Sequence, residues 1–256
     1  MLKITSLLSR KDNYIWLIRS ETGPEAVVVD PGEAGPVEHA LRKRRLTLVA
    51  ILVTHHHYDH VEGITELITR YQVPVFGPAN EPIPCLTQPV GEGEHITLKG
   101  VGMEFSVMEI PGHTTGHVGY YGHGTFFCGD TLFAAGCGKV FDGTPEQLFR
   151  SLQRISRLPE ETLVYCAHEY TEENLQFALT VEPGNPALGE RLEKIRQLRA
   201  AGLPTLPVTL AEEKQTNPFL RCHEPEVIRA VEQFTGRPLV STEEVFVALR
   251  RWRDRI

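Results

Sequence analysis

A dense group of histidine and aspartate side chains lies between residues 55 and 60. The segment Thr54–His60, which reads THHHYDH, follows the apolar run Val49–Val53 and holds four of the chain's eleven histidines. In extended backbone, His55 and His57 point to the same side of the chain, and Asp59 and His60 follow at the next turn. Imidazole and carboxylate groups are ligands for zinc, iron or manganese. The spacing therefore predicts a metal site.

Three further candidate ligands each follow an apolar run of their own. They are His113, Asp130 and His168. Side chains at the ends of several strands can converge on one edge of a sheet. A single histidine after a strand is more often a surface residue, but the group at 55–60 makes these three candidates for the same site. The combined set exceeds one metal shell and predicts a pair of ions.

Short runs rich in Val, Ile, Phe and Tyr, separated by Gly and Pro, must form the strands that position these ligands. The expected strands are 4–8, 14–19, 26–29, 49–53, 73–76, 105–110, 118–121, 126–128 and 162–165. The expected helices are 61–71 and 145–158, followed by 172–181, 187–201, 225–234 and 242–253. The order of these predicted strands and helices indicates a mixed α/β domain over residues 1–168 and a helical domain over 169–256.

Two helix starts carry recognisable capping signals. Thr144 stands before Pro145, with Gln147 in the capping-box position. Ser241 or Thr242, with Glu244 shortly after, resembles the capped start of the last helix.

The composition is that of a globular protein, with 256 residues of which 41% are hydrophobic and 23% charged. The excess of 33 acidic over 26 basic residues argues against a general nucleic-acid binder. Five scattered cysteines without a CxxC pair argue against a disulfide framework or a thiolate zinc site.

No apolar stretch approaches the ~20 residues of a membrane helix. Asp12 interrupts any signal-peptide pattern, so a cytoplasmic protein is expected.

The candidate ligands resemble those of the metallo-β-lactamase superfamily. The longer strings THHHYDH, GDTLFAAGCGK and CAHEYTEEN are similar to its glyoxalase II, or hydroxyacylglutathione hydrolase, family. The resemblance covers nearly the whole chain and implies an α/β fold, a four-layer αββα sandwich followed by a small all-helical C-terminal domain. It also implies two divalent metal ions, of which zinc is the preferred metal and iron or manganese are the alternatives. The implied ligands are His55, His57 and His113 for one ion, Asp59, His60 and His168 for the other, and Asp130 as a bridge together with a water or hydroxide.

A pair of cations suits the hydrolysis of a thioester. Two adjacent ions can lower the pKa of a bound water to about 7, and the resulting hydroxide would attack a carbonyl whose oxygen a metal stabilises. The leaving thiol, with a pKa of about 8.5, needs no strong general acid. By resemblance, Asp59 and Asp130 hold the catalytic positions. The chain has no G-x-S-x-G elbow, and Cys137 has no adjacent base.

The substrate is inferred from segments outside the ligand set. The run Leu249–Arg255 carries four arginines in an acidic chain, and Arg250 and Arg253 share a helix face. In the resembled family the matching pair holds the glycine carboxylate of glutathione. Without that resemblance, the helix macrodipole would explain both cations.

Other matched positions complete the expected substrate site. The residues that match glutathione contacts are Lys139, Phe141 and Tyr170. Animal members have a tyrosine where this chain has Phe141 and a lysine where it has Arg253, which changes the donors offered to the peptide.

Three polar residues near the ligands have other interpretations. Asp30 either orients a ligand histidine from outside the metal shell or only shapes its Asp-Pro-Gly turn. His117 and His123 are left outside the site.

The expected activity is hydrolysis of S-(2-hydroxyacyl)glutathione thioesters. The main substrate would be S-D-lactoylglutathione, converted to D-lactate and glutathione in the second step of methylglyoxal detoxification by a monomeric enzyme. The main alternative is an enzyme of the same fold that holds one iron and resembles a glutathione persulfide dioxygenase. A non-catalytic metal-binding module and a nucleic-acid-processing enzyme are weaker alternatives.

Overall fold

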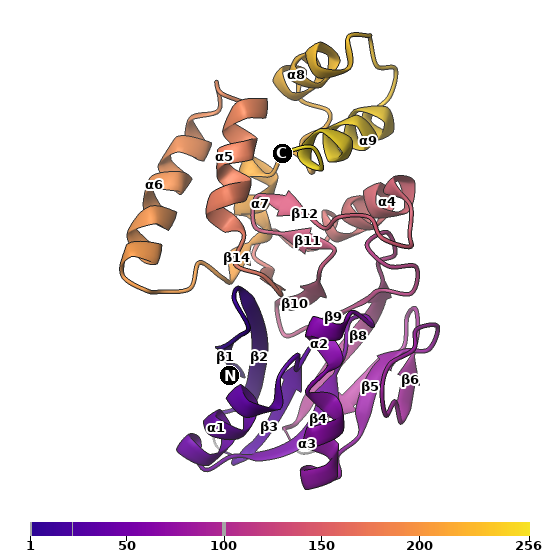
Figure 1. The fold of residues 1–256 in the computed structure, drawn as a ribbon, viewed down its shortest axis with the longest axis vertical. Coiled ribbons are helices and arrows are strands. Elements are labelled where there is room, and N and C mark those ends of the chain that lie inside the picture. The colour runs from indigo at the N-terminus through magenta and orange to yellow at the C-terminus, as the bar shows by residue number, and fades with distance from the viewer. Residues whose placement is uncertain (1, 22, 99–100) are drawn as a thin grey trace. The chain divides into compact units, whose positions relative to one another are not determined.

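The structure is a computed structural model that describes residues 2–21, 23–98 and 101–256 (Figure 1). Its internal contacts divide the chain into two compact units. The first comprises Met1–Glu109 and Gly116–Gly129, and the second comprises Ile110–Thr115 and Asp130–Ile256. The expected domain boundary after residue 168 stays a prediction.

A six-stranded mixed sheet forms one half of the first unit. Its strands, in spatial order, are β1 (Leu2–Ser9), β2 (Asn13–Ser20), β3 (Glu25–Val29), β4 (Thr47–Leu52), β5 (Val75–Pro78) and β6 (Gln88–Val90). Strands β1 to β3 pair antiparallel, whereas β3 to β6 pair parallel. Parallel neighbours need crossover connections. These contain α1 (Ala34–Arg44) between β3 and β4, and α2 (Tyr58–Val61) and α3 (Ile64–Tyr71) between β4 and β5.

Helix α1 was not expected from the sequence. Gly35 and Pro36 resemble chain breakers, but both lie in the first turn, where proline removes no hydrogen bond. The helix buries Val37 and Leu41 in one apolar cluster with Ile15 of β2. Helices α1 and α3 thus pack together against the sheet in this apolar cluster (Figure 1).

An antiparallel meander forms the other half of the first unit. Its strands are β7 (His95–Leu98), β8 (Met103–Glu109), β9 (Val118–Gly122) and β10 (Thr125–Gly129). The Tyr120 hydroxyl on β9 donates a 2.7 Å hydrogen bond to the Val53 carbonyl, at the end of β4. Burial raises the pKa of Tyr120, so this hydroxyl keeps its proton and remains a donor. The bond ties the meander to the segment that begins the histidine group.

The second unit is mainly helical. Its elements are β11 (Leu132–Phe133), β12 (Gly136–Cys137), α4 (Pro145–Ile155), β13 (Leu163–Cys166), α5 (Thr171–Val181), α6 (Pro186–Ala200), β14 (Val208–Thr209), α7 (Leu210–Thr216), α8 (Pro225–Thr235) and α9 (Thr242–Arg253). Helices α5 and α6 lie side by side and enclose a second apolar cluster (Figure 1). No helix within the described part of the chain is long and apolar enough to cross a bilayer.

Local sequence signals located most of these helices. The predicted capping box of Thr144 and Gln147 is present at the start of α4, and Ser241 caps α9 by accepting from the Glu244 backbone N–H. The expectation of no strand beyond residue 168 was wrong at β14, which pairs with β13. A two-residue strand is too short to produce a periodic pattern, and β11 and β12 were missed for the same reason. The three-residue β6 and the four-residue β7 were missed as well.

Gly129 provides a test of how closely the first unit packs beside the ligands. Its φ is +49°, and an added Cβ would meet the Thr54 hydroxyl and lie 2.7 Å from the His117 ring. Gly124 has a similar φ of +72° but open space around it. We expect Gly124→Ala to lower the free energy of unfolding by about 1 kcal/mol through backbone strain alone, and Gly129→Ala to lower it by about 2 kcal/mol more.

Urea unfolding followed by circular dichroism measures both values. Equal losses for the two variants would contradict the close packing around Gly129.

Candidate functional site

The predicted metal ligands are divided between the two units. The first unit holds His55, His57, Asp59 and His60, and the second holds His113, Asp130 and His168. In the first unit they occupy the loop after β4 and the first turn of α2. In the second unit, His113 lies in the loop after β8, Asp130 lies between β10 and β11, and His168 follows β13.

In the first unit, a chain of hydrogen bonds determines which nitrogen of His55 is available. Asp30, in left-handed backbone just after β3, accepts a 2.8 Å hydrogen bond from the Thr54 hydroxyl. A threonine hydroxyl has one proton, so toward His55 Nδ1, at 3.0 Å, it acts as acceptor. His55 is therefore protonated on Nδ1 and carries its lone pair on Nε2. That nitrogen lies 3.1 Å from Nδ1 of His57.

Asp30 also lies against His60. Its Oδ2 atom is 3.1 Å from Nδ1 of His60, and Nε2 of His60 is 3.7 Å from Oδ2 of Asp59. The same Asp59 oxygen accepts a 2.9 Å hydrogen bond from the Asn13 side-chain amide. A carboxylate beside one ring nitrogen is the arrangement common around metal-binding histidines. Asp30 is thus in contact with Thr54 and His60 at once.

Glu81 holds the histidine loop from the opposite side and was not identified from the sequence. Its carboxylate accepts from the His56 backbone N–H at 2.6 Å and lies 2.9 Å from the His56 ring. Its other oxygen accepts from the Gly116 N–H at 3.1 Å. Glu81 is buried. A lone glutamate in an Asn-Glu-Pro turn carries no sequence signal for this role.

His117 also belongs to this neighbourhood, although the sequence analysis left it outside. Its ring is fully buried and stacks on the His55 ring, with centroids 4.6 Å apart and 17° between the planes. It follows His113 by four residues, a spacing that could have drawn attention to it. His123, by contrast, lies in the turn between β9 and β10 and accepts from the Glu104 N–H.

In the second unit, Asp130 stands between two histidines. Its Oδ2 atom is 3.4 Å from Nε2 of His113 and 3.4 Å from Nε2 of His168. Nδ1 of His113 is 2.6 Å from the Lys139 carbonyl, which only accepts. The Nε2 lone pair of His113 therefore faces the carboxylate oxygen. A cation bound between this nitrogen and the carboxylate oxygen would satisfy both groups.

Three predicted substrate contacts surround the histidines of the second unit. The Tyr170 ring stacks on His168 with centroids 4.8 Å apart and 7° between the planes. The Phe141 ring packs edge-on against His113 at 5.1 Å and is 62% exposed. Lys139, whose carbonyl orients His113, is also exposed. These residues are placed to contact a ligand that approaches the histidines.

The two predicted carboxylate-binding arginines have different surroundings. Arg250 is buried, and its Nη1 donates to the Cys137 carbonyl at 2.9 Å while Nη2 donates to Asp254 at 3.0 Å. Arg253 is partly exposed and lies over the Phe177 ring at 5.5 Å. Arg253 has no carboxylate partner in the described part of the chain. Arg250 therefore supports the turn at Cys137, and Arg253 is the more available of the two.

Cys137 is not a nucleophile in this environment. Burial raises the pKa of its thiol to about 11, although Arg250 nearby opposes the shift. The thiol is therefore protonated at neutral pH and unreactive. Burial also raises the pKa of Cys166. The polar chemistry of the site comes from imidazole and carboxylate groups.

The donor set fits a divalent metal. The available nitrogens of His55 and His113 are each defined by an acceptor at the other ring nitrogen, His60 lies beside Asp30, and carboxylates accompany them. Nitrogen and oxygen donors without thiolate suit zinc, iron or manganese. The chain thus carries the histidine and aspartate groups of a divalent metal site.

Comparison with known proteins gives consistent matches along the chain. The model of the metallo-beta-lactamase superfamily matches residues 10–168, and that of the hydroxyacylglutathione hydrolase C-terminus matches residues 169–256. The chain is 52% identical over 248 residues to a hydroxyacylglutathione hydrolase of Halorhodospira halophila, covering 97% of each chain. It is 50% identical over 257 residues to one of Photobacterium profundum, covering 99% of each.

A solved structure shows the same fold over nearly the whole chain. ETHE1 from Myxococcus xanthus matches with a TM-score of 0.67 and 27% identity, covering 98% of each chain. The α/β fold with a helical C-terminal region, expected from the sequence, is confirmed.

The carboxylate of Glu81 provides a test of how the histidine loop is held. We expect Glu81→Gln to weaken metal retention by about tenfold, because an amide cannot accept from both backbone N–H groups and the His56 ring with the strength of a carboxylate. Metal remaining after titration with a chelator measures the effect. Glu66→Gln, an exposed change on α3, is the matched control. Equal retention in both variants would contradict the role of Glu81.

Proposed function

Since this chain belongs to the hydroxyacylglutathione hydrolase family of the metallo-β-lactamase superfamily, we propose that it hydrolyses S-(2-hydroxyacyl)glutathione thioesters. The main substrate is S-D-lactoylglutathione, and the products are D-lactate and glutathione. The chain is thus an enzyme, a thioester hydrolase. The observation that carries the proposal is Asp130, whose carboxylate oxygen stands 3.4 Å from both His113 and His168 in a chain of this family.

Two metal ions would be held by the predicted ligands of the two units. One ion would take His55, His57 and His113, the other Asp59, His60 and His168, and Asp130 would be shared. When bound, these ions would activate water and polarise the thioester carbonyl. Asp30, through Thr54, keeps the Nε2 lone pair of His55 available, and it also lies 3.1 Å from Nδ1 of His60.

Departure of the leaving group does not require a general acid from the protein. Hydrolysis forms a carbon–oxygen bond and breaks the carbon–sulfur bond, and the sulfur leaves as a thiolate. Because a cysteine-type thiol has a pKa of about 8.5, no strong acid has to protonate the leaving group. Asp59 and Asp130, the two catalytic carboxylates of this proposal, would help to hold the ions that activate the water. The buried, protonated Cys137 thiol takes no part.

The glutathione part of the substrate would be held by the second unit. Lys139 and Arg253 supply cations for its carboxylates, and Tyr170 and Phe141 supply ring surfaces beside the histidines. Arg250 supports the turn at Cys137 that leads to Lys139. Residues 169–256, which match the family's C-terminal model, form the substrate-binding helical domain in this proposal.

Three finer assignments accompany the proposal. Zinc is the preferred metal, since the ligands are imidazole and carboxylate groups, with iron or manganese accepted by the same set. The enzyme acts as a monomer, and its compartment is the cytoplasm.

Steady-state hydrolysis of S-D-lactoylglutathione, followed by loss of thioester absorbance, tests the proposal directly. Metal content is measured on the same preparation. We expect turnover with two metal ions per chain, and a loss of at least about 100-fold in kcat for Asp130→Asn, because the amide cannot replace the shared carboxylate. A fully metallated protein without turnover would overturn the substrate. Oxygen uptake with glutathione persulfide would then favour the mono-iron alternative.

The different surroundings of the two arginines give a second prediction. We expect Arg253→Ala to raise KM for the glutathione thioester by about tenfold with little change in kcat, because one charge-assisted contact is lost. Arg253→Lys should restore much of the affinity. Arg250→Ala should raise KM and also lower Tm, because it leaves the Cys137 carbonyl without its donor. The same KM increase for a thioester lacking glutathione would contradict the assignment of Arg253.

A further inference from the structure

The four arginines at residues 250–255 lie on α9 or just beyond its end, and they have different surroundings. Arg250 and Arg253 lie on the helix face that includes buried Val245, Phe246 and Leu249. Arg251 of α9 and Arg255, which follows the helix, line a pocket of about 360 Å³. The proposed thioester hydrolysis uses the first pair only. The proposed hydrolysis therefore does not explain why Arg251 and Arg255 line one pocket.

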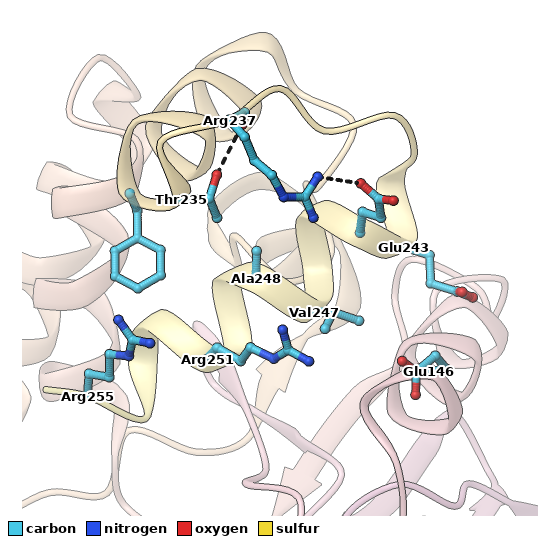
Figure 2. Close-up of a pocket in the computed structure, with 10 residues that line it drawn as sticks. Glu146, Thr235, Arg237, Glu243, Val247, Ala248, Arg251 and Arg255 are labelled. Carbon is cyan, nitrogen blue, oxygen red and sulfur yellow. Dashed lines mark hydrogen bonds and ion pairs between the residues drawn. The ribbon is translucent and has the colours of Figure 1, made fainter.

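The pocket is formed by α4, α8 and α9 and the segments that flank them (Figure 2). Ala248 and Val247 of α9 provide part of its apolar wall, and Phe234 of α8 provides an aromatic ring. Figure 2 shows Arg255 at one end of the pocket and Glu146 at the other, with Arg251 between them. All these residues belong to the second unit. A volume of this size suits a small molecule rather than a single ion.

Two of the three arginines that line the pocket, Arg251 and Arg255, are not neutralised by carboxylates. Their like charges share one pocket, where they repel each other. Neither has an ion pair in the described part of the chain, whereas Arg237 at the same pocket pairs with Glu244 at 3.4 Å. The macrodipole at the end of α9 favours both cations, but it does not require that they share one pocket.

The Arg255 end of the pocket is held in place by aromatic stacking. The guanidinium lies over the Phe234 ring at 5.3 Å. Phe234 in turn stacks on Trp252, with centroids 5.0 Å apart and 8° between the planes. Arg255 is therefore positioned rather than freely mobile, which lowers the entropy cost of binding an anion.

The opposite end of the pocket is acidic. Glu146, in the first turn of α4, has no ion pair in the described residues, and Glu243 has only a distant one, 3.9 Å to Arg150. A simple anion would be attracted by the arginines and repelled by these carboxylates. A ligand with an anionic end and a cationic end would be attracted both by the arginines and by the carboxylates of the pocket.

We propose that this pocket binds a small zwitterion, an amino acid or short peptide whose carboxylate contacts Arg251 and Arg255 and whose ammonium group faces Glu146 and Glu243. The volume of the pocket, about 360 Å³, leaves room for a short peptide. The site does not depend on the proposed thioester hydrolysis, because it uses none of its residues.

Titration of the isotope-labelled, metal-loaded protein with glycylglycine tests the proposal. The readout is the nuclear magnetic resonance signal of each guanidinium Nε–H, assigned with Arg251→Gln and Arg255→Gln. We expect saturable shifts of both signals, binding at least about tenfold weaker for N-acetylglycylglycine, which lacks the ammonium group, and loss of binding in the double variant. Arg229→Gln, an exposed change on α8, is the matched control and should bind as the parent does.

Each other result has a definite meaning. Free glycine that binds as tightly as glycylglycine would assign the zwitterion site to amino acids. Equal binding of N-acetylglycylglycine or inorganic phosphate would overturn the zwitterion in favour of a simple anion. Absent shifts, or shifts that persist in the double variant, would overturn the site. Hydrolysis of S-D-lactoylglutathione by the double variant, expected to be unchanged, separates this outcome from a failure of the proposed function.

Discussion

The placement of one carboxylate, Asp30, governs the histidine loop of the first unit. Strands β3 and β4 run parallel, so the residues after their ends meet at the same edge of the sheet. There Asp30 accepts from both the backbone N–H and the hydroxyl of Thr54, at 2.8 Å each. Thr54 then directs the proton of His55, and Asp30 itself lies against His60. The ligand chemistry of this loop thus depends on a strand pairing that contains no ligand.

In the second unit, the segment after Asp130 is held in place by hydrogen bonds with residues distant in sequence. The segment after Asp130 forms the short β11–β12 hairpin, and the buried carboxylate of Glu213 accepts from the Ala135 N–H within it, at 2.9 Å. Arg250 donates to the Cys137 carbonyl at its end. Both supporting residues lie far along the chain in helical segments. Glu213 and Arg250 therefore hold in place the hairpin that follows Asp130. The helical part of the second unit thus has a structural role in addition to any role in ligand binding.

Much of this protein could be read from its sequence because the signals are local. The histidine group at 55–60 follows an apolar strand, and Thr144 with Gln147 forms a capping box that needs only neighbouring residues. Glu81 and the α1 helix could not be found in this way. Glu81 acts on Gly116, 35 residues away, and α1 begins with residues that resemble a turn.

The sequence by itself determined the donor types, the family and the alternation of strands and helices, since side-chain chemistry and periodicity are properties of short segments. Only the tertiary structure decided which nitrogen of His55 and of His113 is available, because that depends on an acceptor brought from another strand or turn. It also separated the C-terminal arginines. Spacing places Arg250 and Arg253 on one helix face, but packing buries Arg250 against a carbonyl and leaves Arg251 and Arg255 beside a pocket.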